Sequence, residues 1–229
     1  MSIITFKDVY KTKGKQITFG KIDLDLSLNQ IVTVVGPKES GKSTFLNLLS
    51  GVDSSFNGDI FIDNHLINEH TKSIISYCPS VIMLDIHYNV KKLIKLFKSF
   101  YKDFDEEKTI EFLAKNSIDI NKKLGSFKIQ DQYLIQLILI LGRQSLIYLI
   151  DDLFTQLNKD KINNIIEVIK EYSSRSLIIL TTSSFDNTSE YSDLFLFFKE
   201  GKLMSLITNE ELHTKKSVNS YSWEVFSYV

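Results

Sequence analysis

The chain has 229 residues, of which 43% are hydrophobic and 24% are charged. This length and composition are typical of one large globular domain with a sizeable core. A net charge of −1 gives no electrostatic case for nucleic-acid binding, and we expect no nucleic-acid partner. The single cysteine, Cys78, cannot form an internal disulfide. We expect it to be a buried structural thiol in a protein of a reducing compartment.

The sequence offers no segment that would insert into a membrane. Its N-terminus lacks the basic start and apolar stretch of a signal peptide. The longest apolar run, residues 134–141, is interrupted by Gln136 and is far shorter than the ~20 residues that a membrane span needs. A role at a membrane is therefore expected to come through a partner.

The first part of the chain predicts strands. Residues 3–9 and 22–28 alternate apolar with polar side chains, which is typical of half-buried antiparallel strands. Residues 31–35 are apolar without alternation, as in a strand that is covered on both faces. Further strands are predicted at 60–63 and at 74–79, where Pro79 ends the strand.

The middle of the chain predicts helices. A lysine-rich helical pattern from about Tyr88 to Asn116 indicates an inserted α-helical subdomain, approximately residues 80–130. Residues 133–141 are apolar on every side, and their length favours a buried helix over a strand. The last third predicts a buried strand (146–150), an amphipathic helix (161–172), a third buried strand (177–180), a hairpin (194–207) and a C-terminal tail (210–229) with a short helix around Trp223, Val225 and Phe226.

Residues 36–44 read G-x-x-x-x-G-K-S between a predicted strand and a predicted helix, which is a complete phosphate-binding loop. The loop amides and the helix N-terminus converge on one point and attract a polyphosphate. Lys42 is expected to reach the β- and γ-phosphates, and the Ser43 hydroxyl to bind Mg²⁺. The predicted nucleotide-binding residues are Gly36, Pro37, Lys38, Glu39, Ser40, Gly41, Lys42, Ser43 and Thr44.

Two carboxylates follow the second buried strand. Asp151 has the position of the residue that completes the Mg²⁺ shell with Ser43, and Asp152 could orient or deprotonate an attacking water as a catalytic residue. The Asp152 side chain is one methylene shorter than a glutamate. No D-x-x-G follows the loop, and residues 158–161 lack the aspartate of an N-K-x-D motif, which disfavours a GTPase.

The order of these motifs resembles the nucleotide-binding subunit of an ABC transporter over essentially the whole chain, and residues 192–203 are similar to the ending C-D-R-V-x-x-L-K-D-G-K-L of that family. The resemblance implies an α/β fold. It comprises a P-loop NTPase (RecA-like) core with a mainly parallel sheet, an antiparallel β subdomain and the helical subdomain, in a single domain over residues 1–229. Residues 100–105 and 121–124 resemble a bacterial exporter branch, the ABC-2-type ATPases.

Several family motifs are altered in this sequence. The resemblance places the Mg²⁺-sensing glutamine at Ser80, the catalytic glutamate at Asp152 and the switch histidine at Ser183. Serine is too short to bridge Mg²⁺ and water, and it cannot offer the γ-phosphate the positive charge of a histidine. Other altered positions are the adenine-stacking aromatic (Lys13, for which Tyr10 could substitute), the L-S-G-G-Q signature (Phe127, Lys128, Ile129, Gln130, Asp131) and the aspartate that reaches across the dimer (Asn158).

These changes lead us to expect ATP and Mg²⁺ binding with slow hydrolysis at the chain's own site, because losing one group that stabilises a transition state can cost about 10²–10³ in rate. The resemblance implies two partners, namely a second ATP-binding subunit and integral membrane permease subunits that contact residues 80–116. It also implies a cytoplasmic location on the inner face of the membrane. Both a homodimer and a heterodimer are open, and the altered motifs suggest the impaired half of a heterodimeric pair.

A different class of function stays open beside an exporter subunit. The chain could be an ATP-responsive regulatory or immunity module that neither transports nor hydrolyses. A P-loop kinase ranks low, because it would want an arginine-rich lid and the sequence contains only Arg143 and Arg175.

Overall fold

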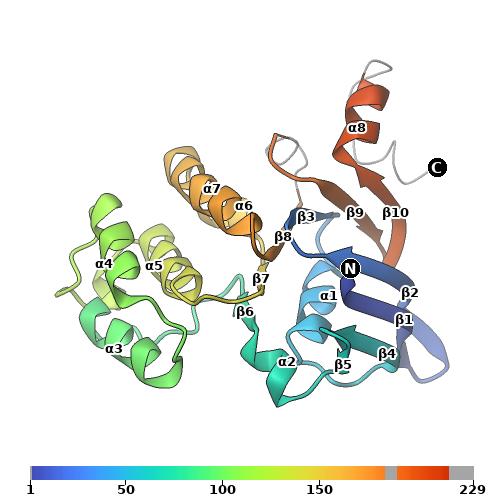
Figure 1. Cartoon of the computed structure of the whole chain (residues 1–229), viewed down its shortest axis with the longest axis horizontal. Helices are drawn as coiled ribbons and strands as arrows, with labels where there is room; N and C mark the ends of the chain where they lie inside the picture. Colours follow the sequence, from blue (N-terminus) through green and yellow to red (C-terminus); the bar gives the residue numbers. More distant parts are fainter. Residues whose placement is uncertain (1, 184–189, 217–229) are drawn as a thin grey trace.

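The computed structural model describes residues 2–183 and 190–216, which form two β-sheets and flanking helices (Figure 1). The strands are β1 (Ser2–Lys13), β2 (Gln16–Ser27), β3 (Gln30–Val35), β4 (Asn57–Ile62), β5 (His65–Leu66), β6 (Ile75–Cys78), β7 (Ile147–Ile150), β8 (Leu177–Thr182), β9 (Leu194–Lys199) and β10 (Lys202–Thr208). The helices are α1 (Lys42–Leu49), α2 (Glu69–Ser73), α3 (Val90–Phe100), α4 (Glu106–Lys115), the 3₁₀ helix η1 (Leu124–Ser126), α5 (Ile129–Leu141), α6 (Leu153–Gln156), α7 (Lys159–Ser173) and α8 (Asn209–Lys216).

The larger sheet has the strand order β10-β9-β3-β8-β7-β6, and every neighbouring pair in it is parallel except β9 with β10. Alternate residues of β8 are buried on opposite faces. Ile178 and Leu180 pack in the cluster that includes α5 and α7, whereas Leu177 and Ile179 pack in the cluster that includes α1 and the second sheet. Because neither face meets water, β8 is apolar throughout. The predicted parallel core is confirmed.

The smaller sheet is antiparallel, with the strand order β2-β1-β4-β5. It packs on the face of the larger sheet that carries α1, and the rings of Phe6 and Phe45 stack there with centroids 5.2 Å apart. The β9–β10 turn joins the two sheets, since the carbonyl of its Gly201 accepts a hydrogen bond from the amide of Gly20 at 2.9 Å. The predicted antiparallel strands and the closing hairpin are confirmed.

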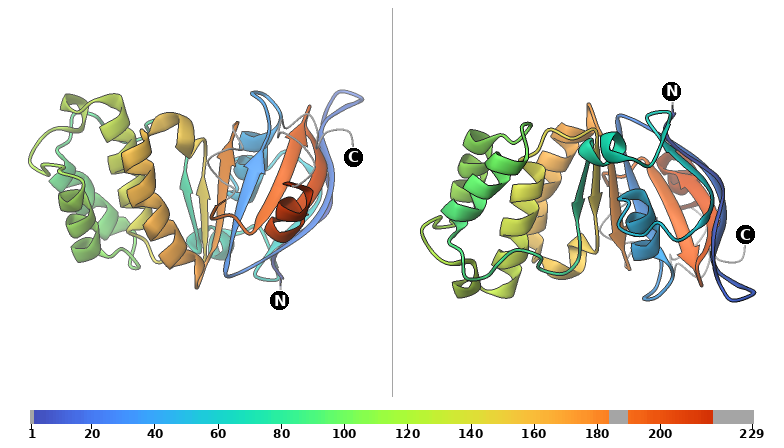
Figure 2. Two further views of the ribbon diagram at one scale, coloured as in Figure 1. Left: turned by 90° about the horizontal axis from the view of Figure 1, so that it is seen from above. Right: turned by 90° about the horizontal axis from the view of Figure 1, so that it is seen from below.

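The helices α3, α4, η1 and α5 form what we call the helical lobe, which lies at the end of the molecule opposite the antiparallel sheet (Figure 2). The helical block expected from Tyr88 to Asn116 consists of two helices, and the second begins in the charged run 103–108, which is typical of a helix cap. Two local interactions cause the break between the two helices. Asp105 caps α4 by accepting a hydrogen bond from the Lys108 amide at 3.0 Å, and Phe104 is buried against the ring of Phe97.

The residues at the C-terminus extend the hairpin into a helix. Leu212 of α8 is fully buried in a small cluster with Val35, Phe195, Phe197 and Ile207. The short helix predicted around Trp223, Val225 and Phe226 lies outside the described residues. In residues 2–183 and 190–216, none of the helices is both long enough and apolar enough to cross a bilayer.

Arg143 joins the helical lobe to the larger sheet. Arg143 is 7% exposed, and its guanidinium donates to the carbonyls of Ser73 and Ile75 at 2.6 and 2.9 Å and pairs with Asp103 at 3.0 Å. The same group lies over the ring of Tyr101, 4.2 Å from its centroid. A cation in this setting satisfies buried carbonyls on one element and a carboxylate on another, so the junction depends on it.

We predict that Arg143→Met destabilises the fold by about 2–4 kcal/mol, because each buried hydrogen bond to a charged group contributes about 1.5–3 kcal/mol and such contributions do not add fully. Thermal unfolding should show a midpoint lowered by about 5–15 °C. Arg175→Met is the matched control, since Arg175 is exposed, and it should leave the midpoint nearly unchanged. Equal effects of the two changes would contradict this role of Arg143.

Candidate functional site

The phosphate loop, residues 36–44, connects the end of β3 to the start of α1. Gly41, the residue before α1, has a φ of 105°, and a Cβ at this position would lie 3.1 Å from the Cα of Gly201. The carbonyl of Ser40 accepts a hydrogen bond from the amide of Gly201 at 2.9 Å. The loop therefore needs glycine at position 41, and the β9–β10 turn holds it from behind.

The N-terminus of α1 has the properties of an anion site. Its first turn contains no acidic residue, and no side chain caps it. Within the described part of the chain, Ser40 Oγ is one of the few buried side-chain oxygens without a hydrogen-bond partner. Free helix amides and an unpaired hydroxyl together suit a ligand that is rich in oxygen acceptors.

Lys42 lies folded against the loop. Its Nζ donates to the carbonyl oxygens of Gly36 and Pro37, each at 2.7 Å. Burial lowers the pKa of Lys42 below its ordinary value, and the nearby carboxylates of Asp152 and Asp151 partly oppose this effect. A phosphate would give this half-desolvated ammonium group a stronger acceptor than two carbonyls.

Asp151 is held rigidly at the end of β7. It is 3% exposed, its Oδ1 accepts a hydrogen bond from Thr181 Oγ1 at 2.5 Å, and its backbone carbonyl accepts one from the Tyr133 hydroxyl at 2.9 Å. Thr181 belongs to β8, the strand between β7 and β3. The parallel strands thus bring the buried carboxylate to the same sheet edge as the phosphate loop.

Asp152 has a different setting. Its φ of 56° places it in the left-handed region, and its amide donates to Thr181 Oγ1 at 2.8 Å. Its carboxylate Oδ2 accepts a hydrogen bond from Thr155 Oγ1 at 2.5 Å. The carboxylate predicted to act on a water molecule is therefore already engaged by the first turn of α6.

One cavity of about 430 Å³ brings part of the predicted site together, whereas Gly36, Pro37, Ser40, Gly41 and Thr44 do not line it. Its walls include Lys42 and Ser43 of the loop, Asp151 and Asp152 of β7–α6, and Ser80, the position where the resemblance expects glutamine. The rest of its lining is Lys38, Glu39, Thr155, Gln156 and Ser183. Three carboxylates against two ammonium groups repel a polyphosphate, and a divalent cation among them removes that repulsion.

A second cavity of about 520 Å³ adjoins the first, because both are lined by Ser43, Ser80 and Asp151. It extends along residues 79–84 toward the helical lobe, where Phe97 and Ile140 line it. Exposed Val81 and Met83 make its wall apolar. Ser43 and Asp151, the residues predicted to hold Mg²⁺, therefore border both the first cavity and an apolar groove beside the helical lobe.

Gln136, which interrupts the apolar run 134–141, has a structural role beside the site. It is 1% exposed on α5, and its amide group donates to the carbonyls of Pro79 and Val81 at 3.3 and 3.0 Å. Its Oε1 accepts a hydrogen bond from the Met83 amide at 2.7 Å. One side chain thus fixes the backbone of residues 79–83 to α5, and a lone polar residue inside an apolar helix was the signal for it.

The other altered motifs lie outside this cavity. Lys128 is the residue before α5 and provides no side-chain cap, and Ile129 is 63% exposed. Asp131 forms an ion pair with Lys161. Asn158, where the resemblance expects aspartate, caps α7 by accepting a hydrogen bond from the Lys161 amide at 3.1 Å.

Three further predicted positions, Tyr10, Lys13 and Cys78, lie away from the cavity lining. Lys13, at the position of the family's adenine-stacking aromatic, and Tyr10, its suggested substitute, lie on β1 and do not line the cavity. Cys78 is completely buried, and burial raises the pKa of its thiol to about 12, which suits the predicted structural role.

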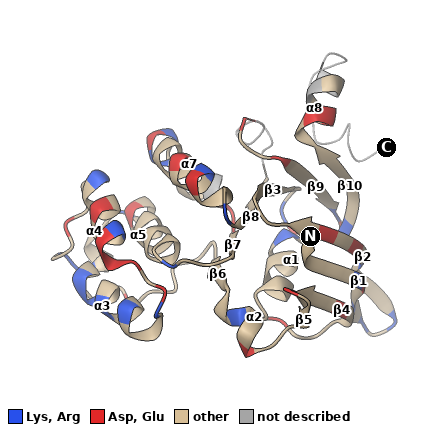
Figure 3. Ribbon diagram, in the orientation of Figure 1, with Lys and Arg blue, Asp and Glu red and all other residues tan. Residues whose placement is uncertain are grey.

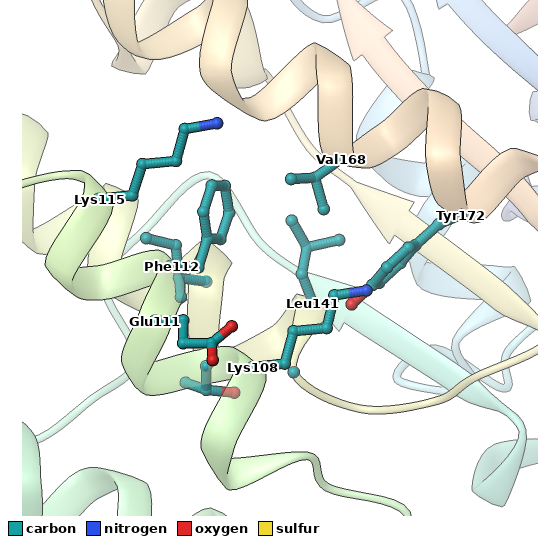
Figure 4. A pocket seen from close by; sticks show the side chains of 10 residues that line it. Lys108, Glu111, Phe112, Lys115, Leu141, Val168 and Tyr172 are labelled. Carbon is teal, nitrogen blue, oxygen red and sulfur yellow. The ribbon is translucent and has the colours of Figure 1, made fainter.

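A small apolar cavity of about 180 Å³ lies between α4, α5 and α7 (Figure 4). Phe112, Leu141 and Val168 line it. The two lysines at its rim are both paired, Lys108 with Glu171 at 2.8 Å and Lys115 with Glu167 at 3.3 Å. We interpret it as a gap in helix packing rather than a site for a charged ligand.

The fold and the loop define a nucleoside-triphosphate-binding domain of the P-loop class. The chain belongs to the ABC transporter family, since the family model described as "ABC transporter" matches residues 19–155, more than half of the chain. Its core, its antiparallel sheet and its helical lobe are those of the family's ATP-binding cassettes, as the comparison with solved structures indicates.

The named relatives have low sequence identity, and the chain spans less than two thirds of the length of several of them. The chain is 23% identical to an Fe(3+) ions import ATP-binding protein of Vibrio cholerae over 93% of this chain and 63% of that protein. It is 20% identical to a glutamine transport ATP-binding protein of Bacillus subtilis over 88% of this chain and 89% of that protein. Against an ABC transporter A family member of Dictyostelium discoideum it is 27% identical over 90% of this chain, which spans 13% of that larger protein.

Solved structures give the same fold. The ATP-binding subunit of an ABC transporter superposes with a TM-score of 0.87 at 17% identity, covering 98% of both chains. A dimeric ATP-binding cassette solved with ADP and phosphate superposes with a TM-score of 0.78 at 18% identity, covering 90% of this chain and 98% of that one.

We predict that Gln136→Met destabilises the fold by about 1–3 kcal/mol, because it leaves polar backbone groups of residues 79–83 without a partner. The sharper measurement is amide hydrogen exchange, in which the Met83 amide should lose protection. Gln130→Met is the matched control, since Gln130 is exposed on the same helix. Unchanged exchange at Met83 would mean that Gln136 does not hold this segment.

Proposed function

We propose that the protein is the ATP-binding subunit of a membrane ABC transporter and that ATP·Mg²⁺ binding at residues 36–44 is its central activity. The observation that carries this proposal is the single cavity in which Lys42 and Ser43 face the buried Asp151. The loop geometry, the free N-terminus of α1 and the desolvated Lys42 each favour a polyphosphate.

Ser43 and Asp151 are the residues that would hold Mg²⁺. A hydroxyl and a carboxylate are oxygen ligands of the kind that Mg²⁺ prefers. Bound there, the ion would neutralise charge between the β- and γ-phosphates. The hydrogen bond from Thr181 keeps the carboxylate of Asp151 in one orientation, so little rearrangement is needed when the ion binds.

Weak hydrolysis is the second part of the proposal. Asp152 is short and is engaged by Thr155, and the two serines at positions 80 and 183 line the same cavity without offering the groups expected there. We infer that Asp152, which follows the buried Asp151 in the same cavity, accepts the proton from water, and that it does so inefficiently.

The assembly follows from the altered signature. A dimeric cassette is among the similar structures, and in the family resemblance each nucleotide lies between one subunit's loop and the other's signature. Here that position carries Lys128 and the exposed Ile129 at the start of α5. We therefore propose a heterodimer, in which a second ATP-binding subunit supplies the catalytic groups that this chain lacks.

The membrane partner and the direction of transport belong to the same proposal. The apolar groove along residues 79–84 and the lysine-rich α3 (Figure 3) are where permease subunits would contact the protein, on the cytoplasmic face of the membrane. Export is the direction that residues 100–105 and 121–124 predict, whereas one relative reported above is named for iron import.

A regulatory or immunity module that responds to ATP without transport is the second candidate, and the altered catalytic positions favour it. Co-purification separates the two proposals. Stable association with a protein of multiple membrane spans supports the transporter subunit, and its absence from detergent-solubilised membranes supports the regulatory module.

We predict that Lys42→Ala weakens ATP binding about 10- to 150-fold, because a hydrogen bond to a charged group contributes about 1.5–3 kcal/mol. Equilibrium binding of a fluorescent ATP analogue measures this change. Lys95→Ala, at an exposed lysine of α3, is the control and should bind normally. Normal binding by Lys42→Ala would show that the central assignment is wrong.

We predict that the purified chain alone hydrolyses ATP about 10²–10³ times more slowly than a cassette that keeps the catalytic glutamate. Asp152→Asn should lower the residual turnover further, by about 10²-fold, with ATP affinity unchanged. A steady-state phosphate-release assay beside the binding assay separates the two effects. Turnover near that of ordinary transport ATPases would rule out a catalytically impaired subunit.

A further inference from the structure

Asp63, His65 and His70 bring three metal-ligating side chains together at the edge of the antiparallel sheet. One ligand atom of each residue lies within 4.8 Å of the others, and Asp63 Oδ2 is 3.7 Å from His70 Nε2. None of these three residues lines the nucleotide cavity or the groove beside it. We propose that they form a binding site for a divalent transition-metal ion, with Zn²⁺ as the expected occupant.

The sheet fixes two of the ligands. Asp63 and Asn64 have φ values of 50° and 61° and form the two-residue turn between β4 and β5, in which Ile62 pairs with His65. Two successive residues with positive φ define the tight hairpin turn that suits antiparallel strands. The Asp63 amide also donates to the carbonyl of Ile3 in β1 at 2.8 Å, which anchors the turn to the sheet.

The third ligand comes from α2. Asn68 Oδ1 accepts a hydrogen bond from the Thr71 amide at 3.0 Å, and the Asn68 amide donates to Thr71 Oγ1 at 2.9 Å, so a capping box fixes the start of this short helix. Figure 1 shows α2 beside β5. The rings of His70 and His65 meet edge to face with centroids 5.2 Å apart. Two separately anchored elements thus present their imidazoles to one point, and little backbone ordering is left for the ion to impose.

The hydrogen bond of His65 suits ligation. Its Nδ1 lies 2.6 Å from the backbone carbonyl of Asp63, which can only accept a hydrogen bond, so Nδ1 carries the hydrogen. Nε2 then has the free lone pair. Metal-bound histidines commonly donate their other ring N–H to a carbonyl in this way, which orients the ring. The bond that would orient His65 on a metal is therefore already in place.

The donor set selects the ion. Two imidazole nitrogens and one carboxylate oxygen favour zinc and its transition-metal neighbours over Mg²⁺ or Ca²⁺, which prefer oxygen ligands. In a tetrahedral zinc site the ligand atoms lie about 3.3 Å apart, given metal–ligand distances of about 2.0–2.1 Å. Both histidines are exposed and Asp63 is half-buried, so rotation of the side chains closes the present spacing. The fourth position would face solvent and hold water.

The location defines what the ion would do. Only Ile74 separates α2 from β6, so an ion on His70 would tie the start of that strand to the β4–β5 turn. Because the three ligands converge only in the folded chain, the ion would stabilise the fold. The ion would thus act on the stability of the fold, and its binding would not require ATP.

The test uses the full chain without a histidine tag, stripped with a chelator and titrated with Co²⁺ and then Zn²⁺. We expect one equivalent of Co²⁺ to give the visible absorption of a four-coordinate site, Zn²⁺ to displace it, and Zn²⁺ to raise the thermal midpoint. His65→Ala and His70→Ala should each weaken binding more than about tenfold, since even losing a residue that only orients a ligand costs 10–100-fold.

The control is His87→Ala, at an exposed histidine between β6 and α3 that is not part of the cluster, and it should bind as the unaltered chain does. Thermal midpoints in chelator show whether each variant folds. The proposal is overturned if the unaltered chain shows no saturable Co²⁺ or Zn²⁺ binding, or if one-equivalent binding survives in the double variant His65→Ala/His70→Ala.

Discussion

The parallel pairing of β3, β8 and β7 is the constraint on which the site depends. β3 pairs in parallel with β8, and β8 pairs in parallel with β7. The carboxyl ends of β3 and β7, where the phosphate loop and Asp151 begin, therefore lie on the same side of the sheet. The hydrogen bond between Thr181 and Asp151 ties that edge together across two strands. Because both faces of these strands are buried, a slip in register would disrupt the packing on both faces and would separate the loop from its carboxylate. Folding and site assembly are therefore one event.

Much of this architecture follows from the sequence because its signals are local. Strand 31–35, the glycine loop and the Asp151 strand are recognisable from apolar runs and motif spacing alone. The start of α4 is recognisable as well, because the charged run 103–108 is typical of a helix cap, and Asp105 caps the helix there. The contacts of Gln136 and Thr155 could not be foreseen, because each depends on the direction of one side chain in the folded chain. The proposed metal ligands Asp63, His65 and His70 likewise could not be predicted from the sequence, because they converge only when α2 lies beside the β4–β5 turn.

The site combines an intact phosphate loop with altered partners, and the structure gives several of those altered residues ordinary structural roles. Asn158 caps α7, Asp131 pairs with Lys161, and Asp152 accepts a hydrogen bond from Thr155. Residues that are free of a catalytic task can serve the stability of their own helix. The phosphate loop differs, because the positive φ of Gly41 and the uncapped N-terminus of α1 destabilise the fold. A bound phosphate would compensate for both. This contrast favours a protein in which occupancy by nucleotide matters more than its turnover.

The hydrogen bonds of Gln136 have a mechanical consequence. The segment 79–83 lines a cavity together with Ser43 and Asp151, and Gln136 holds it to the middle of α5. The side-chain amide of Gln136 binds two carbonyls and one amide of that segment. The position of the segment is therefore coupled to the position of α5. A shift of residues 79–83 would therefore either break these hydrogen bonds or be accompanied by a movement of α5.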